Sequence, residues 1–365
     1  MSQESREEAV LDAIGERREL VNDAIDEHLP MAEPKRLYEA SRYLLEAGGK
    51  RLRPTVTLLV AEALADVEPL STDYAAFPAL DRSGSDGSGD ATAAGSDDAG
   101  EVDVMASAVS IEVIQSFTLI HDDIMDDDDL RRGVPAVHRE YDTETAILAG
   151  DTLYSKAFEI MLRTQAASER ELQALETLAT TCTKICEGQA YDVGFEERGN
   201  VDLSEYLGMV ELKTAVLYSA ASAVPGMLLG ADDDTVDALA RYGRTVGKAF
   251  QIQDDVLDLT VPSEQLGKQR GSDLVEGKRT VITLHARDQG VDVDSLLDAD
   301  TPEEVTEAEI DEAVGVLEDA GSIQYAEDLA EELVEEGKAE LDVLPDNEAR
   351  QTLRDIADYL IHRGY

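Results

Sequence analysis

Two apolar segments with helical periodicity carry the same aspartate pattern, which limits how the chain can fold. Asp-Asp-x-x-Asp occurs at Asp122, Asp123 and Asp126 and again at Asp254, Asp255 and Asp258. On a helix the first and last aspartates of each set lie about 6 Å apart on one face. Surface helices keep acidic and apolar residues on separate stripes, but these segments are apolar on most sides. The aspartates should therefore face an internal cavity, where carboxylates need partners.

Most of the rest of the chain has the periodicity of amphipathic helix, and strand-type alternation is scarce. We predict helices over residues 7–28, 34–47, 54–64, 106–124, 144–163, 169–188, 203–229 and 236–257, with others to the end. The fold class predicted from this pattern is all-α. The uncharged run 215–231 contains small residues, two serines and a proline, and is short for a membrane span, so we expect a buried helix.

Between about residues 67 and 103 the composition changes to Gly, Ser, Ala, Thr and Asp. Such a segment buries too little apolar surface to offset its chain entropy, so we predict a flexible insertion. Because basic residues precede it and a metal-type motif follows it, we expect one helical domain over 1–365 rather than two.

The chain holds 80 Asp and Glu against 31 Lys and Arg, a formal net charge of -49. Self-repulsion should be severe unless salt screens it, and at about 1 M salt the Debye length is about 3 Å, so we infer a halophilic source. The charge argues against nucleic acid and anionic membrane surfaces as partners. The N-terminal residues show no secretory signal, and Cys182 and Cys186 have neither zinc-site nor disulfide spacing, so a reducing cytoplasm is expected.

In so acidic a chain, clustered carboxylates can also form a solvated surface, as we expect for residues 232–234. The apolar residues that flank the two motifs argue against a solvated surface for these aspartates. Neither motif continues as an EF-hand, and no Glu-x-x-His of a di-iron bundle is present. Magnesium held by carboxylates usually keeps water and takes phosphate oxygens from a substrate. A phosphorylated substrate is therefore expected.

Basic clusters beside the aspartates fit such a substrate. They are GGKRLRP at 48–54, Arg131 and Arg132 after the first motif, Lys213 with Thr214 before the uncharged run, and Lys268, Asp273 and Lys278 after the second motif. Arginine binds phosphate through two hydrogen bonds and lysine as a point charge. An isolated basic pair is more often a surface salt bridge, but together these clusters predict one cavity for two diphosphates.

This ordered set of motifs resembles the trans-prenyltransferases, the isoprenyl diphosphate synthases. GGKRLRP, LIHDDIMDDDDLRRGVPAVH, GDTLYSKAF, EGQAYDV, LKTAVL and FQIQDDVLD-x9-K-x4-D-x4-K occur in that family's order over about residues 38–283. The resemblance implies an isoprenoid synthase-type helical bundle around a deep central cavity, usually as a homodimer. It also implies condensation of isopentenyl diphosphate with an allylic diphosphate (dimethylallyl, geranyl or farnesyl).

The resemblance assigns roles position by position. Two to three Mg²⁺ ions would be bound by Asp122, Asp126, Asp254 and Asp258, with help from Asp192 and Asp273. Isopentenyl diphosphate would be held by Lys50, Arg53, Gln115 and Arg132, and the allylic diphosphate by Arg131, Lys213, Thr214, Gln251, Lys268 and Lys278. Asp122, Asp126, Asp254, Lys213 and Lys268 would act in catalysis. Gln115 stands where many relatives have histidine.

Product length should depend on the cavity floor. Phe117 lies five residues before Asp122, about 7.5 Å along a helix, and its neighbour Thr118 is small. In relatives this combination suggests a twenty-carbon stop, so we predict geranylgeranyl diphosphate as the main product, although aromatic residues are also common in cores. The alternatives are a farnesyl or twenty-five-carbon diphosphate synthase, or a noncatalytic subunit of a heteromeric synthase. A terpene cyclase would lack GGKRLRP.

Overall fold

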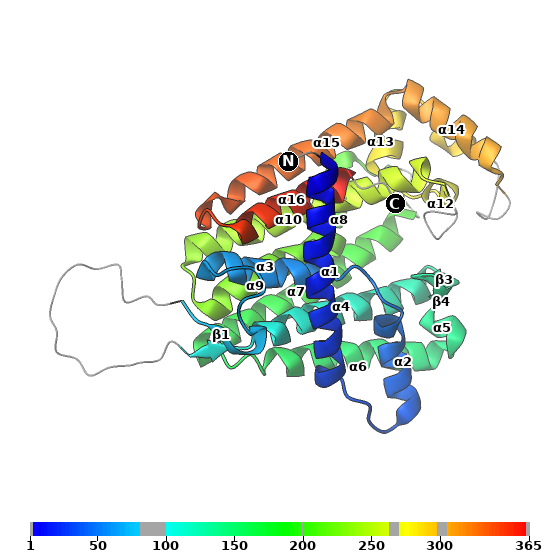
Figure 1. The fold of residues 1–365 in the computed structure, drawn as a ribbon. Helices are drawn as coiled ribbons and strands as arrows, with labels where there is room; N and C mark the ends of the chain where they lie inside the picture. Colours follow the sequence, from blue (N-terminus) through cyan, green and yellow to red (C-terminus); the bar gives the residue numbers. More distant parts are fainter. Residues whose placement is uncertain are drawn as a thin grey trace, which may run out of the picture.

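Helices make up most of the part of the chain that the structure describes (Figure 1). The computed structural model describes residues 3–80, 100–196, 198, 200–262, 270–297 and 305–362. The α-helices are α1 (Gln3–His28), α2 (Lys35–Glu46), α3 (Leu52–Ala65), α4 (Val104–Met125), α5 (Val137–Glu140), α6 (Thr143–Met161), α7 (Ser168–Glu196), α8 (Leu203–Val210), α9 (Val216–Leu229), α10 (Asp233–Thr260), α12 (Ser272–Val275), α13 (Val281–Asp288), α14 (Glu307–Asp319), α15 (Ser322–Glu340) and α16 (Glu348–His362). The predicted all-α fold is confirmed.

The remaining elements are short. A π-helical segment, Glu211–Ala215, joins α8 to α9, and 3₁₀ turns cover Tyr74–Ala76, Val293–Ser295 and Leu341–Val343. Two antiparallel pairs of two-residue strands occur: β1 (Phe77–Pro78) with β2 (Glu101–Val102), and β3 (Leu130–Arg131) with β4 (Val134–Pro135). The β3–β4 hairpin lies directly after α4 and carries the arginines that follow the first aspartate motif.

The helices enclose two clusters of buried apolar side chains. One gathers residues of α8, α10 and α13–α16, and the other gathers residues of α2, α4, α6, α7 and α9. Helices α1 and α3 contribute to both, and Figure 1 shows α1 crossing the front of the bundle. The two motif helices belong to different clusters, α4 to the second and α10 to the first, so the aspartates end up where the two clusters meet.

Both motif helices begin at an aspartate cap. The Asp103 carboxylate accepts a hydrogen bond from Ala106 N at 2.7 Å, and that of Asp232 accepts one from Thr235 N at 2.9 Å. These bonds satisfy backbone N–H groups that a helix leaves unpaired in its first turn. Residues 232–234, expected on a solvated surface, are largely solvent-facing and start α10.

The insertion predicted at 67–103 includes folded residues at both of its ends. Tyr74, Phe77 and Val102 are buried in the second cluster, and β1 pairs with β2. Leu80 N also donates a hydrogen bond to Leu229 O at 2.9 Å, which attaches the segment to the end of α9. Two aromatic side chains supply the apolar area that the composition of the whole segment concealed. Residues 81–99, the rest of the predicted insertion, lie outside the described part of the chain.

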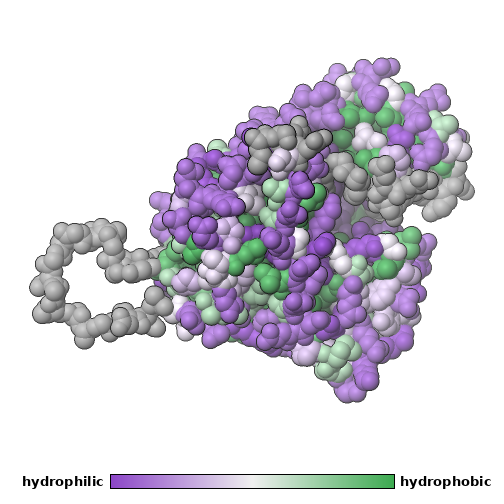
Figure 2. All heavy atoms as spheres, viewed as in Figure 1, coloured by the Kyte–Doolittle hydropathy of each residue, from purple (hydrophilic) through white to green (hydrophobic). Residues whose placement is uncertain are grey.

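Two stretches, Val104–Met125 and Leu203–Leu229, are long and apolar enough to cross a membrane, but 78% of the most apolar window of each is buried inside the protein. The second contains most of the run 215–231, which forms a buried helix as predicted. The face drawn in Figure 2 is covered mainly by hydrophilic residues, in keeping with the acidic composition.

Candidate active site

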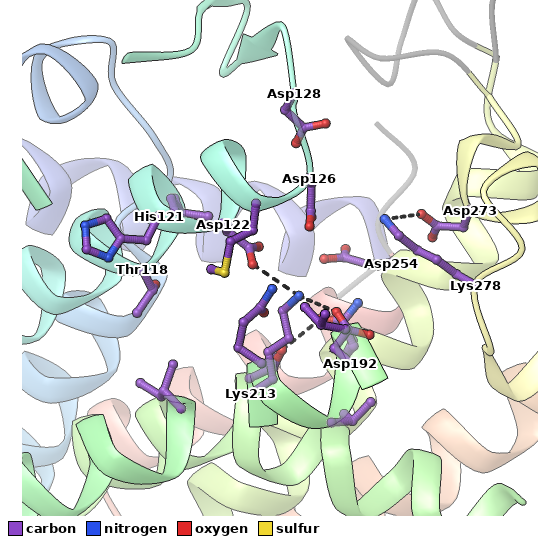
Figure 3. A pocket seen from close by; sticks show the side chains of 18 of the residues that line it. Thr118, His121, Asp122, Asp126, Asp128, Asp192, Lys213, Asp254, Asp273 and Lys278 are labelled. Carbon is purple, nitrogen blue, oxygen red and sulfur yellow. Dashed lines mark hydrogen bonds and ion pairs between the residues drawn. The ribbon is translucent and has the colours of Figure 1, made fainter. Parts of the chain in front are cut away.

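A cavity of about 1310 Å³ lies between the two motif helices, with α7 and the π segment forming another of its walls. Most residues selected from the sequence line it: Arg53, Gln115, Phe117, Thr118, Asp122, Asp126, Arg131, Arg132, Asp192, Lys213, Thr214, Gln251, Asp254, Asp273 and Lys278. Figure 3 shows Asp122 and Asp126, Asp254, and Lys213 with Asp192 converging on the same space from different helices. Lys50 and Asp258 are not among the described lining residues, and Lys268 lies outside the described residues.

The first motif is divided between the cavity and the protein interior. Asp122 and Asp126 face the cavity, whereas Asp123 is completely buried. Arg131 Nε donates to Asp123 Oδ1 at 2.6 Å, and Arg131 Nη2 donates to Asp128 Oδ2 at 2.8 Å. The middle aspartate therefore holds the β3–β4 hairpin against the end of α4, and it positions an arginine that lines the cavity.

Two carboxyl groups of the first motif, those of Asp126 and Asp123, have raised pKa values. Desolvation by the cavity wall, followed by repulsion from Asp122, raises the pKa of Asp126 to about 6. Burial raises the pKa of Asp123 to about 6, against the pull of Arg131. A cation in the cavity would lower the pKa of Asp126, because it would stabilise the ionised form of that carboxyl.

Lys213 links two walls of the cavity. Its Nζ lies 2.6 Å from Asp192 Oδ2 on α7 and 3.3 Å from Asp122 Oδ1 on α4. Lys213 belongs to the π segment, where the sequence predicted an uninterrupted helix over 203–229, so that expectation was wrong at this point. A π turn contains one more residue than an α-helical turn, and the apolar periodicity of the sequence does not reveal it. Such π turns are often found at functional sites.

Gly188 explains how α7 approaches the π segment so closely. A Cβ atom at Gly188 would lie 2.3 Å from Lys213 N, so no larger residue fits without moving the backbone. This contact places Asp192, one turn further along α7, beside the Lys213 side chain. The glycine of EGQAYDV thus has a steric reason, which the sequence alone did not reveal.

The three aspartates of the second motif differ in their contacts. Asp254 and Asp255 both line the cavity. Asp255 is buried, and its carboxylate accepts hydrogen bonds from Tyr206 Oη and from Gln251 Nε2. Asp258 is buried as well; its Oδ1 accepts from Ser272 Oγ at 3.0 Å and its Oδ2 from Asp273 N at 3.2 Å.

Asp258 was predicted to bind magnesium beside Asp254, but its position favours a different role. Its carboxylate holds the start of α12, and with it Asp273, whose Oδ1 lies 3.4 Å from Lys278 Nζ. The i, i+4 spacing on α10 is retained, yet the helix turns Asp258 toward the protein interior rather than the cavity. Metal binding by Asp258 stays a prediction that this geometry does not favour.

The GGKRLRP segment divides its basic side chains in the same way. Arg53 lines the cavity with its guanidinium 4.2 Å from the centre of the Tyr218 ring. Lys50 is exposed and lies over the ring of Tyr359 at 5.8 Å. Arg51, which sequence reasoning passed over, is buried and has a left-handed backbone with φ of 51°.

Arg51 and Arg132 share one buried acceptor. Arg51 Nη1 donates to Glu112 Oε1 at 2.6 Å, and Arg132 Nη2 lies 3.5 Å from the same oxygen. Arg132 Nη1 also donates to Leu44 O at 3.0 Å, and a Cβ on Gly49 would lie 2.9 Å from Arg132 Cζ. Gly49, at φ of 133°, therefore lets the loop before α3 close over the Arg132 guanidinium.

Phe117 lines the cavity and is packed among other aromatic rings. Phe117 is 8% exposed, and its ring makes edge-to-face contacts with His121, at 5.1 Å between centroids, and with Tyr154 of α6, at 5.3 Å. A Cβ on Gly150 would lie 2.3 Å from His121 Nε2, so this glycine makes room for the imidazole. Sequence reasoning found Phe117 and Thr118 but missed Tyr154, because the pairing of α4 with α6 is not local.

The donor set suits magnesium. Within the described residues, no three Asp, Glu, His or Cys side chains are gathered closely enough to hold a metal ion by themselves. The cavity nevertheless offers carboxylate oxygens on two facing walls, the donors that Mg²⁺ prefers. The residues fit an ion whose remaining ligands are water and the phosphate oxygens of a substrate.

Fold and site together define an all-α protein with one cavity in which carboxylates on two walls and several cations face a shared ligand space. The polyprenyl synthetase family model matches residues 34–317. The chain belongs to this family, and it is therefore a transferase of prenyl groups in isoprenoid biosynthesis.

Individual relatives agree over almost the whole chain. Geranylfarnesyl diphosphate synthase of Natronomonas pharaonis is 67% identical over 353 residues, which cover 97% of each protein. Geranylgeranyl diphosphate synthase of Methanosarcina mazei is 47% identical over 356 residues, 98% of each. The solved geranylgeranyl pyrophosphate synthetase of Pyrococcus horikoshii superposes with a TM-score of 0.82 at 35% identity, covering 98% of this chain and 99% of that one. The enzyme of Geoglobus acetivorans gives 0.81 at 40% identity, covering 96% and 99%.

Proposed function

We propose that this prenyltransferase condenses isopentenyl diphosphate with allylic diphosphates, from dimethylallyl to farnesyl, and that its main product is geranylgeranyl diphosphate. The observation that carries the proposal is the cavity itself, since Asp122 and Asp254, on separate helices, both line it together with Lys213 and Lys278. Carboxylates and cations in one cavity suit two diphosphates, one neutralised through metal and one directly.

The lysines are the cations that would hold the allylic diphosphate. Burial alone would lower the pKa of Lys213, but Asp122 and Asp192 outweigh it and raise that pKa above its ordinary value. Asp273 and Glu276 raise the pKa of Lys278 in the same way against its burial. Both ammonium groups therefore stay charged at any working pH, and they can stabilise the negative charge that develops on the leaving diphosphate.

Arginine supports the assignment of the isopentenyl diphosphate site. The Nε atom of Arg53 is buried, and no acceptor among the described residues reaches it. The Arg53 side chain also lines the cavity, where a guanidinium can donate hydrogen bonds to an anion. Gln115 and Arg132 line the same cavity, while Lys50 would act from outside the lining that the structure describes.

Magnesium would be held by Asp122, Asp126 and Asp254, with Asp192 and Asp273 close by, and two to three ions per site are expected. Bound Mg²⁺ would supply Lewis-acid stabilisation of the departing diphosphate. The apolar part of the lining, which includes Leu119 and Ile185, would keep the allylic cation dry. The isopentenyl double bond would then attack, and the proton would leave to the released diphosphate.

Geranylfarnesyl diphosphate is a second candidate product, because the geranylfarnesyl diphosphate synthase of Natronomonas pharaonis is 67% identical over nearly the whole chain. The position of Phe117 favours a twenty-carbon product, since its ring is held in place by contacts with His121 and Tyr154. A farnesyl diphosphate synthase and a noncatalytic subunit are less well supported. A noncatalytic partner would be expected to lack one aspartate set or the basic residues, whereas this chain has both.

The experiment that tests the proposal is incubation of the purified protein with labelled isopentenyl diphosphate, farnesyl diphosphate and magnesium in high salt, followed by chain-length analysis. Mainly twenty-carbon product supports the full proposal. Mainly twenty-five-carbon product keeps the reaction and replaces the product. No elongated product under any salt condition overturns the proposed reaction and revives the noncatalytic alternative.

We further propose a halophilic, cytoplasmic homodimer. Exposed apolar side chains on and beside α6 and α7 support a second copy as partner, among them Leu148 at 56%, Leu162 at 55% and Leu172 at 65% exposure. The charge of -49 supports folding at high salt. Sedimentation in high salt should give a dimer that Leu148→Asp weakens, and circular dichroism should show loss of helix as KCl is removed. A monomer, or a fold indifferent to salt, would contradict these assignments.

A further inference from the structure

Both oxygens of the Asp255 carboxylate are occupied inside the protein. The residue is 5% exposed. Tyr206 Oη donates to Asp255 Oδ2, and Gln251 Nε2 donates to Asp255 Oδ1 at 3.2 Å. Each carboxylate oxygen of Asp255 therefore already accepts a hydrogen bond from another side chain of the protein.

The hydrogen bonds continue from Asp255 to the π segment. Thr214 Oγ1 donates to Gln251 Oε1 at 3.0 Å. The chain Tyr206–Asp255–Gln251–Thr214 therefore connects α8, α10 and the π segment, and all four residues line the cavity. It ties the backbone turn that carries Lys213 to the helix that carries Asp254.

The order of donors along this chain depends on Asp255. Asp255 Oδ1 accepts from Gln251 Nε2 and Gln251 Oε1 accepts from Thr214, so the amide of Gln251 turns its nitrogen toward Asp255 and its oxygen toward Thr214. The hydroxyl hydrogen of Thr214 is then used within the wall. The Gln251 nitrogen carries a second N–H, on a side chain that lines the cavity.

We propose that Asp255 is a positioning residue for the allylic diphosphate rather than a metal ligand. It fixes the Gln251 amide so that its second N–H donates to a diphosphate oxygen, and it keeps Thr214 as a donor to Gln251. This inference rests on the proposed function. The aspartates of the second motif thereby have separate roles, in which Asp254 faces the ligands, Asp255 orients the Gln251 amide, and Asp258 holds the start of α12.

Asp255→Asn tests the proposal with little change in shape. The new amide keeps an acceptor for Tyr206 but presents N–H to Gln251, which must turn over and offer its oxygen. The hydrogen bond from Gln251 to the diphosphate is then lost. Because a hydrogen bond to a charged group is worth a factor of about ten or more, kcat/KM for farnesyl diphosphate should fall by about tenfold or more. The KM for isopentenyl diphosphate and the half-saturating magnesium concentration should stay within about twofold of wild type.

Two matched variants on the same helix serve as the comparison and the control for Asp255→Asn. Asp254→Asn should raise the half-saturating magnesium concentration, because Asp254 is the residue that faces the ligands. Asp237→Asn, on an exposed position of α10, should leave every constant unchanged. If Asp255→Asn raises the magnesium requirement as Asp254→Asn does, Asp255 is a metal ligand and the proposal is wrong.

A double-mutant cycle separates positioning from a general loss of structure. Thr214→Val removes the last donor of the chain, so its effect should be much smaller in the Asp255→Asn background than in wild type. Effects that multiply independently would overturn the proposal. Tyr206→Phe, which removes the other donor to Asp255, should lower the same constant in the same direction, and it serves if Asp255→Asn does not fold.

The activity of the wild-type protein separates a test of the proposed function from a test of the role of Asp255. A wild-type protein that forms no prenyl product in any salt overturns the proposed function and this inference with it. A wild-type protein that elongates farnesyl diphosphate, together with an Asp255→Asn variant of unchanged kcat/KM, overturns only the role of Asp255.

Discussion

Lys213 Nζ lies 2.6 Å from Asp192 Oδ2, so an ammonium group from the π segment is held against α7 at the cavity wall (Figure 3). The same ammonium lies 3.3 Å from Asp122 Oδ1. Before substrate binds, the lysine is therefore neutralised by two carboxylates that were predicted to bind or assist magnesium. When substrate and metal bind, the metal would bind these carboxylates, and the diphosphate would replace them as the partner of the lysine.

Lys213→Ala should lower kcat by about 100-fold or more, because it removes a fixed cation from the leaving group in a buried site. Lys213→Arg keeps the charge and should recover part of that loss. Steady-state kinetics at saturating magnesium check both variants. The substitution Lys184→Ala on α7, outside the cavity lining, is the control and should have no effect. Wild-type turnover in Lys213→Ala would remove the lysine from the proposed mechanism.

Phe117→Ala should shift the product distribution toward twenty-five carbons or longer, because it removes the aromatic ring from the cavity floor. Tyr154→Ala should act in the same direction, since its ring contacts that of Phe117 at 5.3 Å between centroids. Chromatography of the dephosphorylated products measures both shifts. Ile147→Ala, at an exposed position of α6, is the control. An unchanged distribution in Phe117→Ala would place the floor elsewhere.

Glu112→Gln should destabilise the fold without acting directly on the ligands. It removes the charge that pairs with buried Arg51 at 2.6 Å, and the loss of one partner of a buried pair typically costs about 3–5 kcal/mol. The thermal unfolding midpoint in high salt measures this. Glu8→Gln, at an exposed position of α1, should leave the midpoint unchanged. Equal midpoints for Glu112→Gln and wild type would show that this pair does not stabilise the fold.

Asp103→Asn should stabilise the protein at pH 8. Burial raises the pKa of Asp103 to about 6, so the folded state binds a proton more tightly than the unfolded state does. Stability from this carboxyl is present below the unfolded pKa of about 4 and is lost as pH rises through about 6. Asparagine keeps the helix cap without the charge, so the gain should be about 1 kcal/mol at pH 8 and should shrink toward pH 5. A gain that is the same at both pH values would contradict this origin.

The sequence predicted the site well where the signal is local. Asp122 and Asp126 share a helix face by their spacing alone, and the apolar residues around them are enough to indicate a cavity. Arg53, Lys213 and Lys278 were found because basic charge is scarce in this chain. All of these residues line one cavity, as the family resemblance implies.

The rest depends on contacts between segments far apart in the sequence. The burial of Asp258 depends on how α10 meets α12, and the position of Lys50 depends on α16, so spacing could not supply either. Tyr154 contacts the Phe117 ring through the packing of α6 on α4. Tyr206, however, left a signal: it lies seven residues before Lys213, two turns away on a helix. Tyr74 and Phe77 left one too, as aromatic residues at the edge of a segment otherwise poor in apolar side chains.

In the proposed mechanism, aspartates on two separate helices act on the same diphosphate, and this joint action is the feature to test. It is tested most directly by the turnover of Asp122→Asn and of Asp254→Asn, each measured with isopentenyl and farnesyl diphosphates, at saturating magnesium and high salt, on protein whose circular dichroism matches wild type. Each single variant should lose about 100-fold or more in kcat, because neither wall can replace the other. Near-wild-type turnover in either variant would contradict the claim.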